Sequence, residues 1–183
     1  SEDYQEAVIT ETIQQMSDTS ISMTLVLALI KKERLEWAIQ KASELGVARI
    51  VLLESSRCVV KLADKDVEKK LMRYHTIAKE ASEVSHRLTI PKIVGPVTIK
   101  QLNKYHSQLN LLFYENTDAS QTIPALKDIT TVTAIIGPEG GFSEDEVLLM
   151  EGLGYTQTSL THRVVRSETA AIMACVLLGN NNG

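Results

Sequence analysis

The sequence has few cysteines and no long hydrophobic run. Its 183 residues include two cysteines, Cys58 and Cys175, which lie far apart and match no metal-binding spacing. Both lie in apolar segments, so we expect two buried free thiols in a reducing cytoplasm rather than a disulfide. No apolar run reaches the roughly 18 residues that a membrane helix needs. The polar start, Ser1–Tyr4, does not resemble a signal peptide.

Motifs that identify several common enzyme classes are also absent. The chain has no phosphate-loop lysine pattern and no G-x-G-x-x-G at the start of a βαβ unit, which leaves nucleotide triphosphate or dinucleotide binding little support. It has no G-x-S-x-G, no H-E-x-x-H and no Cys/His cluster, so neither a hydrolase triad nor a metal site is indicated. The four histidines are scattered along the chain, and a lone histidine is more often a surface residue than a catalytic one.

The charge of the chain limits how it can meet nucleic acid. The net charge of −4 argues against a protein that coats nucleic acid by bulk electrostatics. Within residues 137–183, two basic side chains accompany six acidic ones, and residues 1–136 are neutral overall. Any nucleic-acid surface is therefore a local patch, or belongs to a part of the protein outside this chain.

Hydrophobic patterning predicts alternating strands and helices. The apolar runs of predicted buried strands are Met23–Ile30, Arg49–Leu53, Leu109–Tyr114 and Thr131–Ile136, with weaker strands at Ile93-Val94 and Tyr155–Leu160. Helices are predicted at Leu35–Leu45, about Asp64–Ser85, Thr98–Tyr105, Ser143 to about Gly152, and from Ser167 onward. A strand, a helix and a strand within about 30 residues form a βαβ unit. The expected class is therefore α/β, with a mostly parallel sheet flanked by helices.

A glycine-rich turn follows the predicted strand Thr131–Ile136. The turn, residues 137–141, leads into a helix whose Ser143 and Glu146 have the spacing of a capping box. Glycine lets another molecule approach the backbone, and turns at the carboxyl ends of strands are where α/β proteins usually bind ligands. Taken alone, the turn is explained equally well by a ligand site and by a plain strand-to-helix connection.

Two segments together resemble the signature of a known family. The stretch Ile136–Ser143 with Glu146, and the stretch Arg163–Ala170, are similar to the paired motifs of the RsmE family. That family belongs to the SPOUT superfamily of trefoil-knotted RNA methyltransferases. Earlier segments agree, at 36–46, 57–61 and 81–87, so the resemblance extends from about Met23 to Leu178.

The resemblance implies a fold, a reaction and partners. It implies S-adenosylmethionine-dependent methylation of N3 of one uridine in small-subunit (16S) ribosomal RNA, without a metal or a membrane. It also implies a deep trefoil knot at about residues 135–175 and a homodimer with the active site near the subunit interface. Family members carry an N-terminal PUA-like RNA-binding domain. Residues 1–20 are therefore expected to be a remnant or linker of that domain, and residues 21–183 the methyltransferase domain.

The resemblance also assigns roles to particular residues. The predicted cofactor-binding residues are Ile136, Gly137, Pro138, Gly140, Gly141, Leu160, Val164, Val165, Thr169 and Ala170. Loss of the uridine N3 proton places negative charge on the flanking carbonyl oxygens, which Arg166 is predicted to stabilise. Glu139 and Glu168 are candidate general bases, although Glu139 also suits a brace for its own loop and Glu168 the first turn of a helix. The residues predicted to hold RNA phosphates are Arg57, Arg87 and Arg163.

Three positions differ from the family pattern. Thr161 replaces a usual glycine, Val84 replaces a usual glutamine, and Ser56 replaces a frequent glutamate. Thr161 narrows its loop, and Val84 removes a polar group from a helix end that is a candidate for RNA contact. Two alternative functions remain open: a SPOUT enzyme that methylates the ribose 2′-oxygen, and a dimeric RNA-binding scaffold that has lost catalysis.

Overall fold

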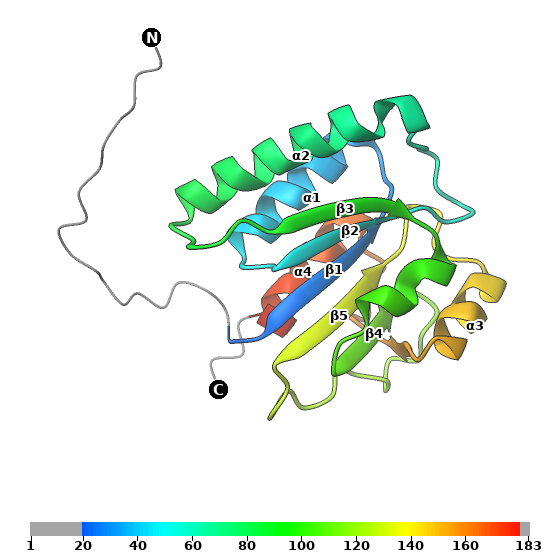
Figure 1. The fold of residues 1–183 in the computed structure, drawn as a ribbon. Helices are drawn as coiled ribbons and strands as arrows, with labels where there is room; N and C mark the ends of the chain where they lie inside the picture. Colours follow the sequence, from blue (N-terminus) through cyan, green and yellow to red (C-terminus); the bar gives the residue numbers. More distant parts are fainter. Residues whose placement is uncertain (1–19, 180–183) are drawn as a thin grey trace, which may run out of the picture.

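A six-stranded sheet forms the centre of the computed structural model, which describes residues 20–179 (Figure 1). The strands are β1 (Ser22–Ala28), β2 (Arg49–Leu53), β3 (Lys92–Val97), β4 (Leu109–Phe113), β5 (Thr131–Ile136) and β6 (Thr156–Thr158). Their order is β3-β2-β1-β5-β4-β6, and all neighbouring strands run parallel, which confirms the predicted parallel sheet. The predicted remnant of an RNA-binding domain, residues 1–20, lies outside the described residues except for Ser20.

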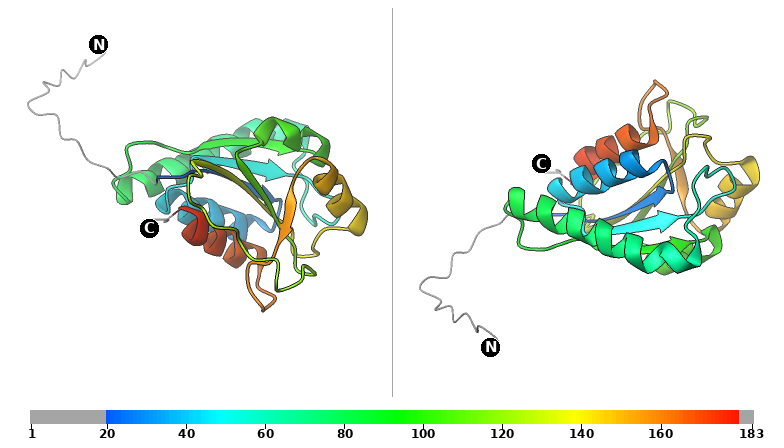
Figure 2. Two further views of the ribbon diagram at one scale, coloured as in Figure 1. Left: turned by 90° about the horizontal axis from the view of Figure 1, so that it is seen from below. Right: turned by 90° about the horizontal axis from the view of Figure 1, so that it is seen from above.

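Helices cover both faces of the sheet. They are α1 (Lys32–Glu44), α2 (Asp64–Val84), the 3-10 helix η1 (Ile99–Tyr105), α3 (Glu144–Gly152) and α4 (Ser167–Gly179). On one face α1 packs between α2 and α4, and on the other η1 packs with α3 (Figures 1 and 2). The predicted helices are all present, the one at 98–105 as a 3-10 helix. In the described part of the chain, no helix has both the length and the apolar character to cross a bilayer.

The central strands are apolar throughout because each contributes to two cores. Leu25 and Leu27 of β1 lie in the core beneath α1, α2 and α4, whereas Val26 between them lies in the core beneath η1 and α3. All three side chains are fully buried. Successive side chains of a strand point to opposite faces, so a strand covered on both faces has no polar side. This explains why the sequence shows continuous apolar runs rather than alternation.

Two element boundaries illustrate where local signals succeed and where they fail. Gly46 ends α1 as expected, with a φ of 91° that favours glycine. In contrast, β3 continues through Gly95 and Pro96, where a strand was predicted only at Ile93-Val94. Proline has no N–H to donate to a neighbouring strand, and it is tolerated here because β3 is an edge strand. The last strand, β6, is shorter than the predicted Tyr155–Leu160.

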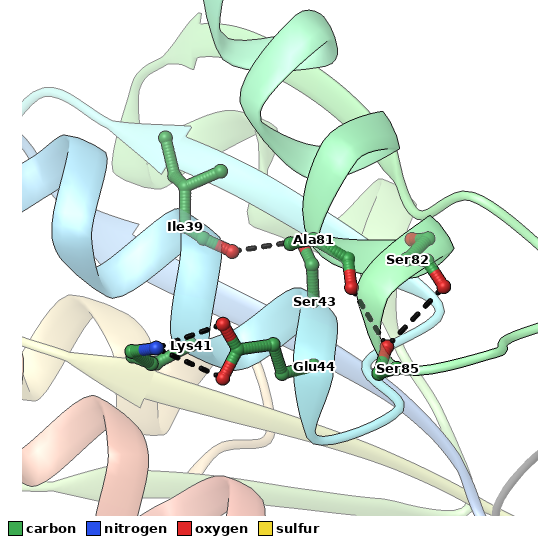
Figure 3. Close-up of polar contacts among 7 residues, drawn as sticks. All are labelled: Ile39, Lys41, Ser43, Glu44, Ala81, Ser82 and Ser85. Atoms are coloured by element: carbon green, nitrogen blue, oxygen red, sulfur yellow. Dashed lines mark hydrogen bonds and ion pairs between the residues drawn. The ribbon is translucent and has the colours of Figure 1, made fainter.

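Serine hydroxyls within the helical layer bond to their own helices. The buried Ser43 of α1 donates to the carbonyl of Ile39 at 2.7 Å (Figure 3). The buried Ser82 of α2 likewise donates to the carbonyl four residues before it, at 2.8 Å. Figure 3 also shows Ser85 donating to the carbonyl of Ala81 at 2.8 Å. Since each hydroxyl is satisfied within its own helix, these serines need no polar partner from the neighbouring helix.

The two cysteines are buried free thiols, as predicted. Cys58 follows β2, and Cys175 lies on the inner side of α4. Burial raises the pKa of the Cys175 thiol to about 12. At neutral pH this thiol is therefore protonated and acts as a small apolar side chain.

The chain leaves the sheet at its outer edge and then returns to the middle. Strand β5 lies between β1 and β4, β6 pairs with the far side of β4, and α4 then packs against β1 and β5. Residues 159–166 make this return alongside the connection 114–130, where Ser159 donates its N–H to the carbonyl of Gln121 at 2.7 Å. This route brings the segments that follow β4, β5 and β6 to one edge of the sheet.

The predicted capping box at the start of α3 is present, and it also holds a second loop. Ser143 donates its N–H to Glu146 Oε2 at 3.0 Å, and Glu146 donates its N–H to Ser143 Oγ at 3.3 Å. The other carboxylate oxygen of Glu146 accepts the N–H of Ser56 at 2.7 Å. Burial alone would raise the pKa of Glu146, but the hydrogen bonds from Ser143 and Ser56 outweigh it and hold the pKa below 4.5.

We expect Glu146→Ala to lower the free energy of unfolding by about 1–2 kcal/mol, because it removes the cap and leaves the Ser56 amide without its acceptor. The loss should depend on pH. Because the pKa is lowered in the folded chain, the carboxylate stabilises the fold above its unfolded pKa, and this contribution disappears as the pH falls through the folded pKa. Chemical denaturation at neutral and at acidic pH measures both effects.

The matched control for this experiment is Asp145→Ala. Asp145 is acidic, exposed and in the same first turn of α3. Like Glu146, Asp145 can interact favourably with the helix dipole, but among the described residues it makes no side-chain hydrogen bond with Ser143 or Ser56. Equal losses for the two variants at neutral pH would contradict the role given to Glu146.

Candidate functional site

A cavity opens where three adjacent parallel strands end. Its volume is about 130 Å³, and its walls come from the segments that follow β4, β5 and β6 together with the first turn of α4. The carboxyl ends of parallel strands are where α/β sheets usually bind ligands. The cavity is therefore a candidate ligand site because of its position in the sheet, independently of any sequence motif.

Most of the residues predicted to bind a cofactor line this cavity. They are Ile136, Gly137, Pro138, Leu160, Val164, Val165 and Ala170. The two signature segments, which are separated by about twenty residues of sequence, therefore face one space. The remaining predicted residues, Gly140, Gly141 and Thr169, lie outside it. Thr161, which departs from the family pattern, also lines the wall.

The structure adds residues that the sequence did not single out. Those that line the cavity are Phe113, Tyr114, Glu115, Ser159, His162 and Ser167. A signal for three of them was present, because a strand was predicted to end at Tyr114 and carboxyl ends of parallel strands meet at one edge. The missing information was the strand order. Periodicity does not reveal that β4 lies beside β5, which is what brings Glu115 to the site.

The far end of the glycine turn is held by the protein's own side chains. Gly141 has a φ of 65°, which favours glycine, and any Cβ there would collide with the carboxylate of Glu115. A Cβ at Gly140 would lie 3.3 Å from the Cβ of Arg57. Arg57 also donates from Nη1 to the carbonyls of Gly140 at 3.1 Å and Phe142 at 3.3 Å. Residues 140–141 of the turn are thus held by the side chains of Glu115 and Arg57, whereas residues 137–138 line the cavity.

One guanidinium contacts both candidate general bases. Arg34, in the first turn of α1, places Nη1 3.4 Å from Glu139 Oε1 and Nε 3.6 Å from Glu168 Oε1. The backbone N–H of Lys31 donates to the same Glu139 oxygen at 3.4 Å. Nothing in the local sequence pattern distinguishes Arg34 from the other charged residues around it. Its contacts join the glycine turn after β5 to the start of α4.

Glu168 retains one oxygen without a partner. The residue is 9% exposed, and within the described residues 20–179 its Oε2 is buried and accepts no hydrogen bond. A buried acceptor left unpaired costs free energy, and such groups are concentrated where function requires them. Glu168 directly follows Ser167, which lines the cavity. The carboxylate is therefore held on one side by Arg34, and its other oxygen is buried without a partner among the described residues.

The arginines predicted to act on substrate fall into two groups. Arg163 and Arg166 are exposed beside the cavity, and among the described residues no ion pair engages either guanidinium. By contrast, Arg57 holds the glycine turn, and Arg87 donates to carbonyls at the end of α1 at 2.9 and 3.0 Å. The first pair is placed to meet a substrate. The second pair stabilises the fold, and its contact with RNA stays a prediction.

Comparison with known proteins identifies the family. A family model for an RNA methyltransferase domain matches residues 17–179. The ribosomal RNA small subunit methyltransferase E of Mesomycoplasma hyopneumoniae is 38% identical over 168 residues, which cover 91% of this chain and 73% of that protein. The chain belongs to the ribosomal RNA small subunit methyltransferase E family.

Solved structures of similar proteins agree with this methyltransferase family. A Legionella pneumophila structure in complex with the bound cofactor S-adenosylmethionine is 35% identical, with a TM-score of 0.76 over 88% of this chain and 66% of that one. The ribosomal RNA small subunit methyltransferase E of Neisseria gonorrhoeae, bound to S-adenosylmethionine, is 26% identical, with a TM-score of 0.75 over 87% of this chain and 66% of that one. The predicted SPOUT-type fold, a parallel sheet flanked by helices, is thereby confirmed, and the knot at about residues 135–175 stays a prediction. This chain spans about two thirds of the length of those structures.

Replacing Arg34 with methionine should lower the free energy of unfolding by about 1–3 kcal/mol, because the buried Glu168 would lose its cation. This loss is smaller than the loss expected for a fully buried ion pair, because the Arg34 side chain is 33% exposed and water screens the interaction. Adding Glu168→Gln to Arg34→Met should recover part of the loss. Urea denaturation of the two single variants and the double variant gives the coupling between the residues.

Lys32→Met is the control, because Lys32 lies in the same helical turn and makes a 3.9 Å ion pair with Glu36 while its side chain is 73% exposed. It should change stability by less than about 1 kcal/mol. Strictly additive effects of Arg34→Met and Glu168→Gln would contradict the coupling.

Proposed function

We propose that this chain transfers a methyl group from S-adenosylmethionine to N3 of a uridine in small-subunit ribosomal RNA. The observation that carries the proposal is that both signature segments line one cavity, at the strand ends of a fold shared with a structure solved with S-adenosylmethionine. The names of the relatives support ribosomal RNA as the substrate, and this substrate places the reaction in the cytoplasm.

The residues around the cavity fit this cofactor. Ile136, Leu160 and Val165 offer apolar surface for an adenine ring, and the glycine turn offers backbone groups at Gly137. The carboxylate of Glu115 supplies an acceptor for hydroxyl or amino groups. At about 130 Å³ the enclosed space admits one ring system, so the rest of the ligand would lie in the open mouth. When bound, S-adenosylmethionine supplies an activated methyl group.

The chain's own residues account for the activation of the uridine. N3 becomes a nucleophile when it loses its proton, and the resulting negative charge spreads to the flanking carbonyl oxygens. We assign the stabilisation of that charge to the guanidinium of Arg166, which is exposed and which no described ion pair engages. Arg163, at the cavity wall, is placed to hold a phosphate of the same RNA.

Glu139 and Glu168 both stay candidate general bases, because in each the Oε2 oxygen makes no hydrogen bond or ion pair among the described residues. Glu139 Oε1 is shared between the Arg34 guanidinium and the Lys31 amide. Glu168 keeps Oε2 without a hydrogen-bond partner among the described residues. A general base needs an oxygen that can accept the proton, and it needs a fixed orientation. Arg34 supplies that orientation, and it acts as a positioning residue rather than a catalytic one.

The apolar outer surface of α1 and α4 supports a homodimer. Val176 and Leu177 of α4 are 44% and 47% exposed, and Trp37 of the neighbouring α1 is 45% exposed. Figure 2 shows these two helices side by side on one face of the molecule. Large apolar side chains exposed together on packed helices are typical of a surface that another chain covers. We infer that a second copy of the chain binds there, over the C-terminal half of α4.

The proposed function predicts that the chain binds S-adenosylmethionine and forms 3-methyluridine. Arg166→Ala should keep cofactor affinity while slowing methyl transfer by about 10²–10³-fold, because its guanidinium acts only as charge develops. Ala170→Phe should abolish cofactor binding, because a ring there fills the cavity. Calorimetric titration measures binding, and mass spectrometry of nucleosides from treated ribosomal RNA identifies the product.

Ala48→Phe is the matched control for the added ring, since Ala48 is exposed and precedes β2 at the opposite edge of the sheet. It should bind the cofactor as the wild-type chain does. No binding by the wild-type chain at millimolar cofactor would favour an inactive scaffold. A methyl group on the ribose would refute N3 specificity.

The dimer is tested separately by introducing charge on α4. Val176→Glu with Leu177→Glu should convert a dimer into a monomer in sedimentation equilibrium, because two carboxylates would be buried at the interface. Leu148→Glu on α3 is the control, since Leu148 is 65% exposed on a different face of the molecule. A wild-type chain that sediments as a monomer at micromolar concentration would overturn this assignment.

A further inference from the structure

A second and larger cavity lies beside the candidate site, between α1 and α2. Its volume is about 380 Å³. One wall is apolar and comprises Ile30 at the end of β1, Val60 in the loop before α2, and Tyr74 of α2. No residue of this cavity lines the first one. Its volume falls within the range of cavities that hold small ligands, which is roughly 300–1,000 Å³.

The rim of this second cavity is basic, in a chain whose net charge is negative. Four cations, Lys32, Lys69, Lys70 and Arg73, accompany two carboxylates, Glu36 and Asp66. The cavity therefore carries the kind of local positive patch that an RNA-binding protein with a net charge of −4 requires.

The ion pairs at the rim leave two lysines available. Arg73 donates to both oxygens of Glu36, at 2.8 and 2.7 Å, and Lys32 lies 3.9 Å from the same carboxylate. Glu36 is thus already occupied by two cations. Across residues 20–179, no ion pair engages Lys69 or Lys70. These two ammonium groups, together with the Asp66 carboxylate one turn before them in α2, are the charges of the cavity that no ion pair engages within residues 20–179.

The second cavity is linked to the proposed reaction site through one backbone hydrogen bond. Its wall residues Ile30 and Lys32 flank Lys31, whose N–H donates to Glu139 of the glycine turn at 3.4 Å. In Figure 1 the start of α2, the end of β1 and the turn after β5 all lie at the arrowhead end of the strands. Both cavities therefore lie at the same end of the strands, where one RNA strand could contact them both.

We propose that the cavity between α1 and α2 receives a nucleotide that flanks the target uridine in the RNA substrate. Lys69 and Lys70 hold its phosphate, and Ile30, Val60 and Tyr74 contact its base or ribose. A nucleotide suits the cavity because it combines a flat, weakly polar ring with an anion, as the walls combine apolar surface with unpaired ammonium groups. The inference rests on the proposed function in that it takes RNA to be the substrate.

The test measures RNA binding by fluorescence anisotropy, with a labelled single-stranded oligouridylate as the probe and the full chain as the protein. Lys69→Ala with Lys70→Ala should weaken binding about tenfold at low salt and reduce the slope of log affinity against log salt by about 1.4. Val60→Phe, which fills the cavity without changing charge, should weaken binding at least about fivefold and leave the slope unchanged. Neither variant should change the affinity for S-adenosylmethionine in calorimetry.

Lys79→Ala is the control, because Lys79 is an exposed lysine of the same helix that pairs with Glu83 and lies outside the cavity. It should bind the probe almost as tightly as the wild-type chain does. An equal loss in Lys79→Ala, or wild-type affinity in Val60→Phe, would overturn the inference, since binding would then be a diffuse surface effect. The proposed function fails separately if the wild-type chain does not bind S-adenosylmethionine, whatever the RNA affinities are.

Discussion

The position of β5 between β1 and β4 is the constraint on which the rest of the structure depends. Ile136, the last residue of β5, lies level with Leu27 of β1 on one side and Phe113 of β4 on the other. All three are buried, so a shift of one residue would move every side chain of β5 to the opposite core. The register therefore fixes where the glycine turn leaves the sheet. It leaves beside the segment that follows β1 and the segment that follows β4.

Polar contacts hold the glycine turn, residues 137–141, in the position that the strand register gives it. Two sets of contacts hold the turn. Arg34 and the Lys31 amide, which follow β1, bind Glu139. Arg57, which follows β2, donates to the carbonyls of Gly140 and Phe142. Glu146 adds a third link through the Ser56 amide. None of these contacts needs a ligand. The turn is pre-organised by the apo protein, so a bound cofactor would not have to order it, which removes a conformational cost from binding.

The local parts of this design were predictable from sequence, and the long-range parts were not. Continuous apolar runs predict the strands, and the spacing of Ser143 and Glu146 predicts the start of α3. Both signals depend on neighbouring residues alone. Strand order depends on the whole chain, and local sequence patterns do not reveal it. They therefore do not show that Glu115, which follows β4, lies at the cavity. Arg34 was missed for the same reason, since its two partners lie more than a hundred residues away. The second cavity was invisible because it needs α1 and α2 to be docked.

The two cavities divide the chemistry of one edge of the sheet. The first is lined by both apolar and polar groups of the loops, and its charged residues are Glu115 and Arg163. The second concentrates lysines. The excess of negative charge lies in residues 137–183, whereas this positive patch lies mainly on α2. Between them stands Glu139, held by Arg34 and the Lys31 amide. The same short segment after β1 thus borders the second cavity and fixes the turn that borders the first. A nucleotide in the second cavity would contact Ile30 and Lys32, the two neighbours of the Lys31 amide that donates to Glu139.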